Sequence, residues 1–562
     1  MAFFVFFLLL APMLSDVVPR SAALNPSIAC NSTLDPKFCM TFLTRPRDCS
    51  LHDYGRFSLA KSLSNARMFL DLVDLYLARR STLSPTSVMA LQDCRLLSSL
   101  NIDFLTTASV TVNYTDTLLG HQAEKLQTLL SALVTNQKTC SDGLKAVPIS
   151  DGLAVPISDC TKLYSMSLAL FNKAWVMPNK TNRGNRSASE VTPHRRGLLF
   201  HEALVDGDRR LPLWISGSKR ELLERWRRRT QRLLQDGTDT ILVHNIVLVS
   251  QDGKGDYTSI TAAVNSAPSN LDGTTAGYYL IFVAAGIYQE YVVVGQRKTY
   301  LMMIGEGINQ TVVTGNHNVA DGRTTFNSAT FAVVGQGFVA MNMTFRNTAG
   351  PAKGQAVAIR NGADLSAFYL CSFEGYQDTL YAHSMRQFYR ECDIYGTVDY
   401  IFGDAAAVFQ RCNVYSRLPL HGQGNTITAQ GRSDPNQNTG TSMQSCRFLA
   451  AADLKAAGHS TRTYLGRPWQ LYSRTVIMES FIDALVDPAG WLPWNGSFAL
   501  ATLYYAEFRN SGPGAGTASR VKWPGFHVIR SGEADNFTAS KFIQGDNWLS
   551  LAGVPYDRGL KL

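Results

Sequence analysis

The chain has 562 residues, and because a domain usually takes roughly 100–200 residues, at least two domains are expected. Hydrophobic residues make up 45% and charged residues 17%, which excludes a disordered chain, and ten cysteines are too few for a disulfide-built mini-protein. The net charge of +9 is local: residues 180–232 hold 14 basic and 6 acidic side chains, whereas residues 233–562 hold 24 and 25. The overall charge therefore does not indicate a nucleic-acid-binding groove, and no nucleic-acid partner is predicted.

The N-terminus has the pattern of a secretion signal. Residues 2–14 form one apolar run, which is as long as the core of a signal peptide and too short to span a bilayer, and residues 21–23 offer a small-residue cleavage site. We predict a signal peptide over residues 1–23, with an uncleaved signal anchor as the alternative, and no second membrane span. A secreted glycoprotein is also indicated by eight N-x-S/T sequons, at Asn31, Asn113, Asn179, Asn185, Asn309, Asn342, Asn495 and Asn536.

Residues 24–175 are predicted to be an all-α domain. Apolar residues recur at helical spacing, as in residues 59–77, and the pattern is typical of a bundle of about four helices. A short duplication over residues 146–159 is expected to be a loop, because Pro148 and Pro156 disfavour helix. Residues 176–240 are a linker with basic clusters, which is either a solvated charge run or a site where a protease separates the two halves.

From residue 241 the period changes to short Val, Ile, Phe and Tyr runs separated by Gly and Asn, which predicts many short strands. One unit recurs every 20 or 21 residues and ends at Cys371, Cys392 and Cys412. A short repeat built of strands without a helix predicts a parallel β-helix. The three cysteines would then form a ladder on successive coils, close enough for a disulfide.

The same register predicts a catalytic cluster. Asp378 and Asp399 are 21 residues apart, and Gln355 lies 22 residues before Gln377, so four polar side chains converge from three coils. Two adjacent carboxylates cannot both ionise easily, which gives a nucleophile beside a protonated acid. Amide N–H groups suit a developing oxyanion, and Arg467 is the candidate to keep the nucleophile charged. This set favours acyl transfer, such as ester hydrolysis.

Other chemistries have no motif in the sequence. The chain contains no G-x-S-x-G, H-E-x-x-H, paired C-x-x-C or G-x-x-x-x-G-K-[ST] pattern. We therefore predict no metal site and no cofactor.

Residues 241–562 resemble the plant pectinesterases (pectin methylesterases). The resemblance rests on segments in the same order along the chain: DGKGDYTSI (252–260), GIYQE (286–290), TTFNSATF (324–331), GQAVAIR (354–360), YQDTLYAHSMRQFY (376–389), GTVDYIFGDA (396–405), TAQGR (428–432), YLGRPW (464–469) and PAGWLPW (488–494). It implies a right-handed parallel β-helix that acts on methyl-esterified polygalacturonate in the cell wall, monomeric once mature.

The resemblance also implies roles for individual residues. Asp399 corresponds to the nucleophile, Asp378 to the general acid and base, and Gln377 to the oxyanion donor. The remaining positions are implied to bind substrate or assist: Gln355, Arg467, Thr325 and Trp469. In this family one disulfide corresponds to Cys392–Cys412.

The N-terminal half resembles the invertase/pectinesterase-inhibitor domain, with Cys30–Cys39 and Cys94–Cys140 as its two pairs; Cys49 and Cys160 are left over and could pair with each other. The resemblance implies an intramolecular inhibitor-like pro-region that a processing protease removes at the linker, where residues 209–212 and 231–234 are the nearest motifs.

Four points stay open at this stage. Asp404 replaces the family's usual Asn and could face the groove or, as we expect, solvent; Tyr400 replaces Phe, a mild change. Trp494 is either a core aromatic or a sugar-stacking one, and His383 is expected to lie at the surface or in the groove rather than to be catalytic. The rival function is a catalytically silent wall-binding protein, autoinhibited by its N-terminal domain. A pectate lyase or polygalacturonase on the same fold would need calcium-binding acidic clusters or inverting carboxylate pairs, which the sequence does not display.

Overall fold

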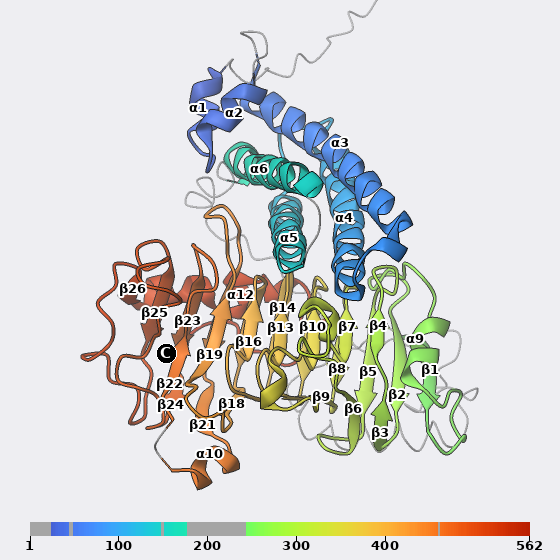
Figure 1. Cartoon of the computed structure of the whole chain (residues 1–562), viewed down its shortest axis with the longest axis vertical. Helices are drawn as coiled ribbons and strands as arrows, with labels where there is room; N and C mark the ends of the chain where they lie inside the picture. Colours follow the sequence, from blue (N-terminus) through green and yellow to red (C-terminus); the bar gives the residue numbers. More distant parts are fainter. Residues whose placement is uncertain (1–23, 44–48, 148–150, 177–242, 459–460, 562) are drawn as a thin grey trace, which may run out of the picture.

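The computed structural model describes residues 24–43, 49–147, 151–176, 243–458 and 461–561. The predicted signal peptide (residues 1–23) and the predicted linker (residues 176–240), apart from its first residue, lie outside the described residues. The described chain forms a helical domain that stands on the side of a long domain of strands (Figure 1). No helix within these described ranges is long and apolar enough to cross a membrane.

The helical domain contains four long helices and two short ones. The long helices are α3 (Leu51–Ala78), α4 (Pro85–Val112), α5 (Gly120–Lys145) and α6 (Ala154–Phe171), and the short α1 (Pro26–Cys30) and α2 (Pro36–Phe42) precede them. Ser50 begins α3 with a capping box, in which its side chain accepts the N–H of Asp53 and Asp53 accepts the N–H of Ser50. The predicted bundle is confirmed, with α1 and α2 as additions.

The duplicated segment differs from its prediction as a loop, because its second copy opens helix α6. Pro156 lies in the first turn of this helix, where a missing N–H costs no intrahelical hydrogen bond. Two disulfides, Cys30–Cys39 and Cys94–Cys140, fix the domain as expected. The suggested Cys49–Cys160 pair is wrong, since both cysteines are free thiols.

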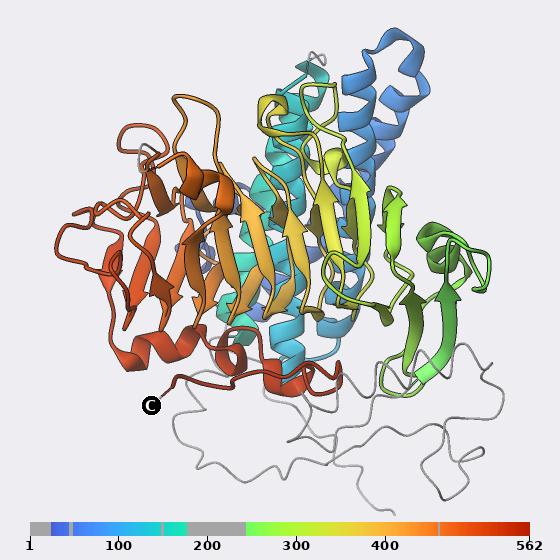
Figure 2. The same cartoon turned by 90° about the horizontal axis from the view of Figure 1, so that it is seen from below.

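The strands form a parallel β-helix, in which successive strands of one coil lie in three different sheets (Figures 1 and 2). The first sheet contains β1 (Val243–Val249), β2 (Tyr278–Val283), β5 (Leu301–Gly305), β8 (Val339–Met341), β11 (Ser366–Tyr369), β14 (Arg386–Arg390), β17 (Ala406–Gln410), β20 (Gly440–Gln444), β23 (Arg474–Met478), β25 (Tyr504–Phe508) and β26 (Phe526–Val528). The second, which we call the groove sheet, contains β4 (Val292–Val294), β7 (Phe331–Val333), β10 (Ile359–Asn361), β13 (Leu380–Ala382), β16 (Ile401–Gly403), β19 (Asn425–Gln430) and β22 (Thr463–Gly466). The third contains β3 (Gly286–Gln289), β6 (Thr311–Gly315), β9 (Thr344–Asn347), β12 (Ser372–Glu374), β15 (Asp393–Gly396), β18 (Asn413–Ser416), β21 (Arg447–Ala450) and β24 (Phe481–Ile482). The predicted fold class is confirmed.

Inside the β-helix, aromatic side chains at equivalent positions of successive coils stack into a ladder. Phe368 stacks on Tyr389 with ring centroids 5.2 Å apart, and Tyr389 stacks on Phe409 at 4.5 Å. Tyr389, and not the neighbouring Phe388, pairs with Phe368 and Phe409 in the strand register. Since side chains alternate between the two faces of a strand, Phe388 points outward and packs near Tyr556 of the C-terminal segment instead.

The cysteine ladder is longer than predicted, and its thiols are free. Cys371, Cys392, Cys412 and Cys446 are all buried and unpaired by disulfides, so the Cys392–Cys412 disulfide that the resemblance implied is contradicted. Each thiol donates to a backbone carbonyl of the preceding coil, as Cys392 Sγ does to Phe368 O at 3.4 Å. The ladder thus satisfies its polar groups without a covalent bond.

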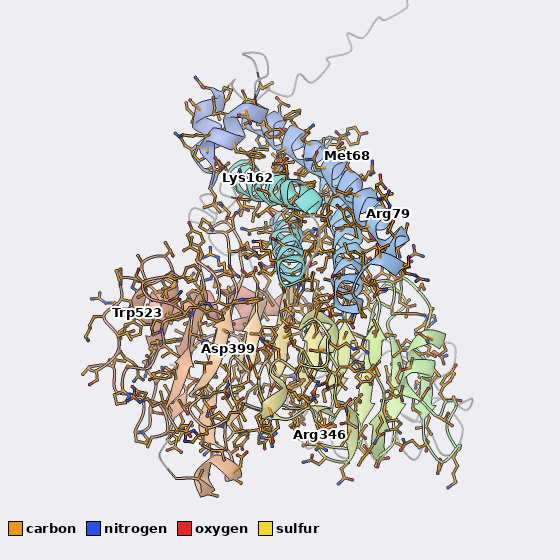
Figure 3. All side chains as sticks on the ribbon, viewed as in Figure 1. Met68, Arg79, Lys162, Arg346, Asp399 and Trp523 are labelled. Atoms are coloured by element: carbon orange, nitrogen blue, oxygen red, sulfur yellow. A yellow bond between two sulfur atoms is a disulfide. The ribbon has the colours of Figure 1, made fainter. Side chains whose placement is uncertain are left out.

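The helical domain packs on the groove sheet through one continuous apolar contact. In Figure 1 the lower ends of α4 and α5 rest against the strand domain, and Figure 3 labels Asp399 on the strand domain below the helices. Apolar side chains from the groove-sheet side join the core of the helical domain: Phe326, Val357, Tyr381, Met385, Phe402 and Ala429.

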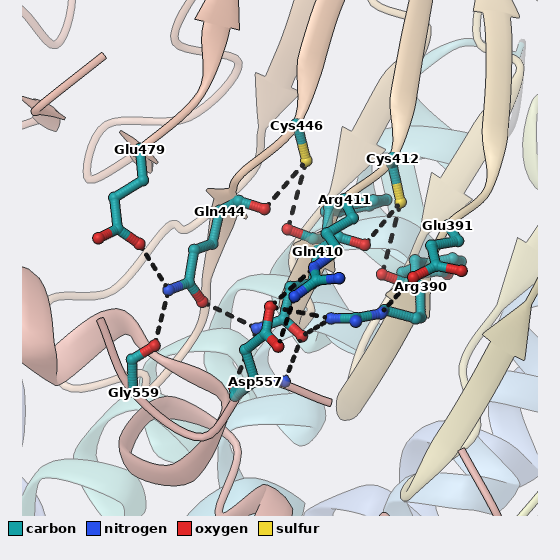
Figure 4. Close-up of polar contacts among 12 residues, drawn as sticks. Arg390, Glu391, Gln410, Arg411, Cys412, Gln444, Cys446, Glu479, Asp557 and Gly559 are labelled. Carbon is teal, nitrogen blue, oxygen red and sulfur yellow. Dashed lines mark hydrogen bonds and ion pairs between the residues drawn. The ribbon is translucent and has the colours of Figure 1, made fainter. Parts of the chain in front are cut away.

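The C-terminal segment closes the first sheet. It contains α11 (Ser531–Ala534) and α12 (Ala539–Phe542), and its Asp557 forms ion pairs with Arg390 at 3.2 Å and Arg411 at 2.9 Å (Figure 4). Further short helical elements include α9 (Ile260–Ser266), which packs beside β1 and β2, α10 (Ala452–Ala456), and the one-turn η5 (Phe326–Ser328). This arrangement leaves the groove sheet as the face that the helical domain covers.

Candidate active site

Asp378 and Asp399 occupy equivalent places on adjacent coils. Each lies two residues before its strand, β13 or β16, and these strands pair in parallel with Leu380 opposite Ile401. Both have left-handed backbone conformations, with φ of 61° and 52°, which Asp tolerates better than most residues. The Asp378 N–H donates to Val398 O at 3.1 Å, so the two residues are separated by one strand spacing of about 4.8 Å.

Arg467 binds the carboxylate of Asp399 with two hydrogen bonds. Its Nε donates to Oδ1 at 2.8 Å and its Nη2 donates to Oδ2 at 2.6 Å. Arg467 lies one residue beyond β22, and its N–H donates to Thr428 O at 2.9 Å, so the groove sheet itself positions the side chain. A bidentate pair of this kind is geometrically specific and fixes the orientation of the Asp399 carboxylate.

Asp378 has the opposite environment. Burial raises its pKa well above the ordinary value and the charge of Asp399 raises it further, while Arg467 opposes these effects. Asp378 therefore keeps its proton at a pH where an exposed Asp has lost it. One carboxyl group is thus ion-paired with an arginine, and its neighbour has a pKa raised by burial and by the adjacent charge.

A cavity of about 550 Å³ lies over this pair and is lined by all seven residues that the sequence singled out for catalysis and substrate binding: Thr325, Gln355, Gln377, Asp378, Asp399, Arg467 and Trp469. Gln377 lies next to Asp378, and its carbonyl accepts the N–H of Ala356 at 3.2 Å, which brings Gln355 in from the preceding coil. The structure thus brings together amide donors, an acid, an ionised carboxylate and aromatic walls.

Trp494 lines the same cavity and is 37% exposed, so it is not a core residue. The Arg467 guanidinium lies 4.4 Å from the centre of its ring. A partly exposed indole face at the edge of a polar groove is suited to a sugar ring. In the described part of the chain, no group of three or more His, Cys, Asp or Glu side chains is placed to hold a metal ion.

The helical domain forms the other wall of the cavity. Asp93 from α4 and Thr139 and Asp142 from α5 face the catalytic residues across it. Direct hydrogen bonds cross the boundary: Thr324 Oγ1 donates to Asp93 at 2.5 Å, and Thr139 Oγ1 lies 3.0 Å from His383 Nε2. The groove is therefore closed on one side by the chain's own N-terminal half.

Asp404 is part of this boundary, and the expectation that it faces solvent is wrong. It is buried, accepts a hydrogen bond from Thr135 of α5 at 2.7 Å, and accepts two more from Gln437 and Thr439 at 2.5 Å each. Burial raises its pKa to about 6, although these donors lower it. His383 is likewise buried at the boundary, and burial lowers its pKa to about 3, whereas a surface or groove position was expected.

The sequence did not reveal Thr426, which contacts Asp399 from the next coil. Its Oγ1 donates to Asp399 Oδ1 at 2.6 Å. No motif marks this residue, because it is one of several threonines in a strand and only the coil register brings it to the carboxylate.

The fold and the cavity define a carboxylic ester hydrolase built on a parallel β-helix, and the chain belongs to the pectinesterase family. The family model described as Pectinesterase matches residues 246–546, and the model described as Plant invertase/pectin methylesterase inhibitor matches residues 26–170. Both resemblances drawn from the sequence are confirmed.

Relatives with the same two-part organisation match nearly the whole chain. "Probable pectinesterase/pectinesterase inhibitor 41" from Arabidopsis thaliana is 53% identical, covering 95% of each chain. "Pectinesterase/pectinesterase inhibitor" from Ficus pumila var. awkeotsang is 40% identical, covering 94% of this chain and 91% of the relative.

Among solved structures, "Pectin methylesterase from Carrot" is similar to the strand domain, with 52% identity and a TM-score of 0.55 over 56% of this chain. The match covers 98% of the carrot chain, so a protein that consists of this half alone forms the complete β-helix.

Proposed function

We propose that the chain is the precursor of a secreted pectin methylesterase, which hydrolyses the methyl esters of polygalacturonate in the cell wall. The observation that carries this proposal is the pair of adjacent carboxyl groups, one ion-paired with Arg467 and the other buried with a raised pKa. The names of the relatives and of the carrot structure support pectin as the substrate. Secretion is supported by the signal-like N-terminus and the sequons.

In the first step Asp399 attacks the ester carbonyl carbon. Gln377, assisted by Gln355, donates N–H hydrogen bonds to the oxygen that becomes negative. Asp378 gives its proton to the departing oxygen, and methanol leaves an acyl anhydride on Asp399. The shifted pKa of Asp378 suits this role as an acid.

In the second step water cleaves the anhydride. Asp378, now ionised, takes a proton from the attacking water, and the C–O bond to Asp399 breaks. The product is the free galacturonate carboxyl group, and both aspartates return to their starting states. Trp469, Trp494 and Thr325 line the same cavity and are proposed to hold the sugar chain.

The test uses the catalytic half, obtained by placing a protease site in residues 177–242 and separating the products. Asp399→Ala should abolish methanol release from methylated pectin, while Asp272→Ala, an exposed Asp outside the cavity, should keep wild-type activity. Full activity of Asp399→Ala would falsify the mechanism.

The second candidate is a catalytically silent wall-binding protein. The closure of the groove by α4 and α5 favours it for the uncleaved chain. The same cleavage experiment separates the two functions. Methanol release that appears only after cleavage supports a latent enzyme, whereas silence of the separated half despite a folded β-helix supports the binding protein.

A further inference from the structure

The side chain of Thr426 contacts both the backbone N–H and the carboxylate of Asp399. It lies on β19, one coil beyond β16, and is fully buried. Thr426 Oγ1 donates to Asp399 Oδ1 at 2.6 Å, and Thr426 Oγ1 also accepts the backbone N–H of Asp399 at 2.9 Å. One side chain thus holds the main chain and the carboxylate of Asp399 together.

The two oxygens of Asp399 are consequently unequal. Oδ1 accepts from Thr426 Oγ1 and from Arg467 Nε, whereas Arg467 Nη2 is the only donor to Oδ2 within the residues that the structure describes. A carboxylate oxygen has two lone pairs in the plane of the group, so Oδ1 is saturated and Oδ2 retains one.

Asp378 provides an internal comparison at the equivalent place one coil earlier. It has the same left-handed backbone, but its N–H donates to the carbonyl of Val398, which cannot donate in return. No hydrogen bond reaches the Asp378 carboxyl group from the described coils. The hydroxyl of Thr426 is therefore one of the features that make two equivalent aspartates different.

We infer that Thr426 is a positioning residue for the nucleophile, which fixes the carboxylate of Asp399 so that Oδ2 is the attacking atom. This inference rests on the proposed function, since it assumes that Asp399 attacks the ester. Thr426 does not line the cavity and acts through Asp399.

The test compares three catalytic halves: wild type, Thr426→Val and Thr426→Ser. Val keeps the shape of Thr without the hydroxyl, and Ser keeps the hydroxyl. Thr426→Val should lower kcat for methanol release by about tenfold or more with KM changed less than about twofold. Thr426→Ser should restore most of kcat, because it keeps the hydroxyl that bonds Asp399.

Three outcomes would overturn the inference: an unchanged kcat in a folded Thr426→Val, an equal loss in Val and Ser, or a rise in KM alone. Thermal unfolding checks the fold of each variant. If Thr426→Val fails to fold, Thr426→Cys replaces it, because its thiol is a weaker donor at the position of the hydroxyl and should lower kcat in the same direction, with Thr426→Ser as the control that also lacks the methyl group.

A crystal structure tests the atom assignment separately. In Asp378→Asn with a methylated oligogalacturonide, the ester carbon should lie nearer to Oδ2 than to Oδ1 of Asp399, and the reverse order would remove the assignment. The failure of this inference is distinct from that of the proposed function. An inactive Asp399→Ala beside an unaffected Thr426→Val rejects the role of Thr426 alone, whereas an active Asp399→Ala rejects the mechanism itself.

Discussion

At the scale of single residues, the two aspartates show how neighbouring groups give identical side chains different chemical roles. Asp378 and Asp399 have the same backbone conformation and the same place in the coil, yet Arg467 pairs with only one of them. The pKa of Asp378 is raised by burial and by the adjacent negative charge. The difference between acid and nucleophile is therefore set by what surrounds each carboxyl group.

Arg467→Lys in the catalytic half should lower kcat by about tenfold or more, because an ammonium group cannot form the two parallel hydrogen bonds to Asp399. Methanol release measures the loss. The exposed Arg462→Lys, five residues earlier, is the control and should keep its activity. A kcat within twofold of wild type for Arg467→Lys would show that the charge alone is sufficient.

At the scale of elements, the aromatic ladder couples neighbouring coils. Tyr389 is fully buried between Phe368 and Phe409. Its hydroxyl donates to Gln387 Oε1 at 2.7 Å and accepts from Asn361. The residue thus contributes packing to three coils and satisfies two buried polar groups.

Tyr389→Ala should lower the free energy of unfolding of the catalytic half by about 3–5 kcal/mol, as expected for a large buried aromatic that leaves a cavity. Urea unfolding measures the change. Phe498→Ala removes an aromatic that is 38% exposed and should cost less than about 1 kcal/mol. Equal losses of unfolding free energy in the two variants would mean that the aromatic ladder stabilises the fold no more than an exposed aromatic does.

The contact of α4 and α5 with the groove sheet should depend on pH. Burial raises the pKa of Asp93 and of Asp404 to about 6, from an ordinary value of 3.8, whereas burial lowers the pKa of His383 to about 3 from 6.5. Between pH 4 and 6 the docked state binds a proton at each of these two carboxyl groups that the separated halves do not bind. It lacks the proton that His383 carries in the separated halves. The net uptake is about one proton, so docking should tighten about tenfold for each unit that the pH falls.

A linker-cleaved sample measured by gel filtration tests this sign. The two halves should stay together at pH 4 and separate more readily at pH 6, with little further change above that. Asp404→Asn removes one of the two carboxyl groups, so net uptake becomes about zero and the trend should flatten in the same window. Stronger docking at pH 6 than at pH 4 in the wild type would contradict the assignment of the boundary groups.

At the scale of the whole molecule, the helical domain packs on the β-helix and covers the cavity that holds the two aspartates. The helical domain has its own core and two disulfides, and the β-helix has a separate core. The two meet where the cavity lies, so cutting the linker does not by itself open the groove. Release also requires the loss of the polar and apolar contacts at the boundary.

Once separated, the catalytic half should bind cell walls with weak dependence on salt. Residues 233–562 carry 24 basic and 25 acidic side chains, so the half has almost no net charge to attract the anionic product. Retention on de-esterified wall material between about 0.05 and 0.5 M salt measures this, since salt at these concentrations screens charges beyond roughly 4–14 Å. A steep loss of retention with added salt would reveal a charged patch that the net charge conceals.

The sequence by itself determined the repeating coil of the β-helix and the cluster of catalytic side chains. A 20- or 21-residue period fixes which residues recur on successive coils, and the period alone brings Asp378 beside Asp399 and Gln355 toward Gln377. Regular structure of this kind is readable because each coil contacts mainly its neighbours, so spacing along the chain converts directly into position.

Only the tertiary structure decided the contacts between segments far apart along the chain. Thr135 meets Asp404 across 269 residues, which turned a position expected to face solvent into a buried one. Thr426 reaches Asp399 through a coil that is longer than the repeat. Cys392 and Cys412 stay reduced within a ladder of four thiols whose spacing allowed several pairings. Periodicity cannot specify the contact of Thr135 with Asp404, because it depends on how two surfaces with no common repeat pack together. Within the β-helix, periodicity specifies neither the length of an irregular coil nor which of several adjacent thiols are oxidised.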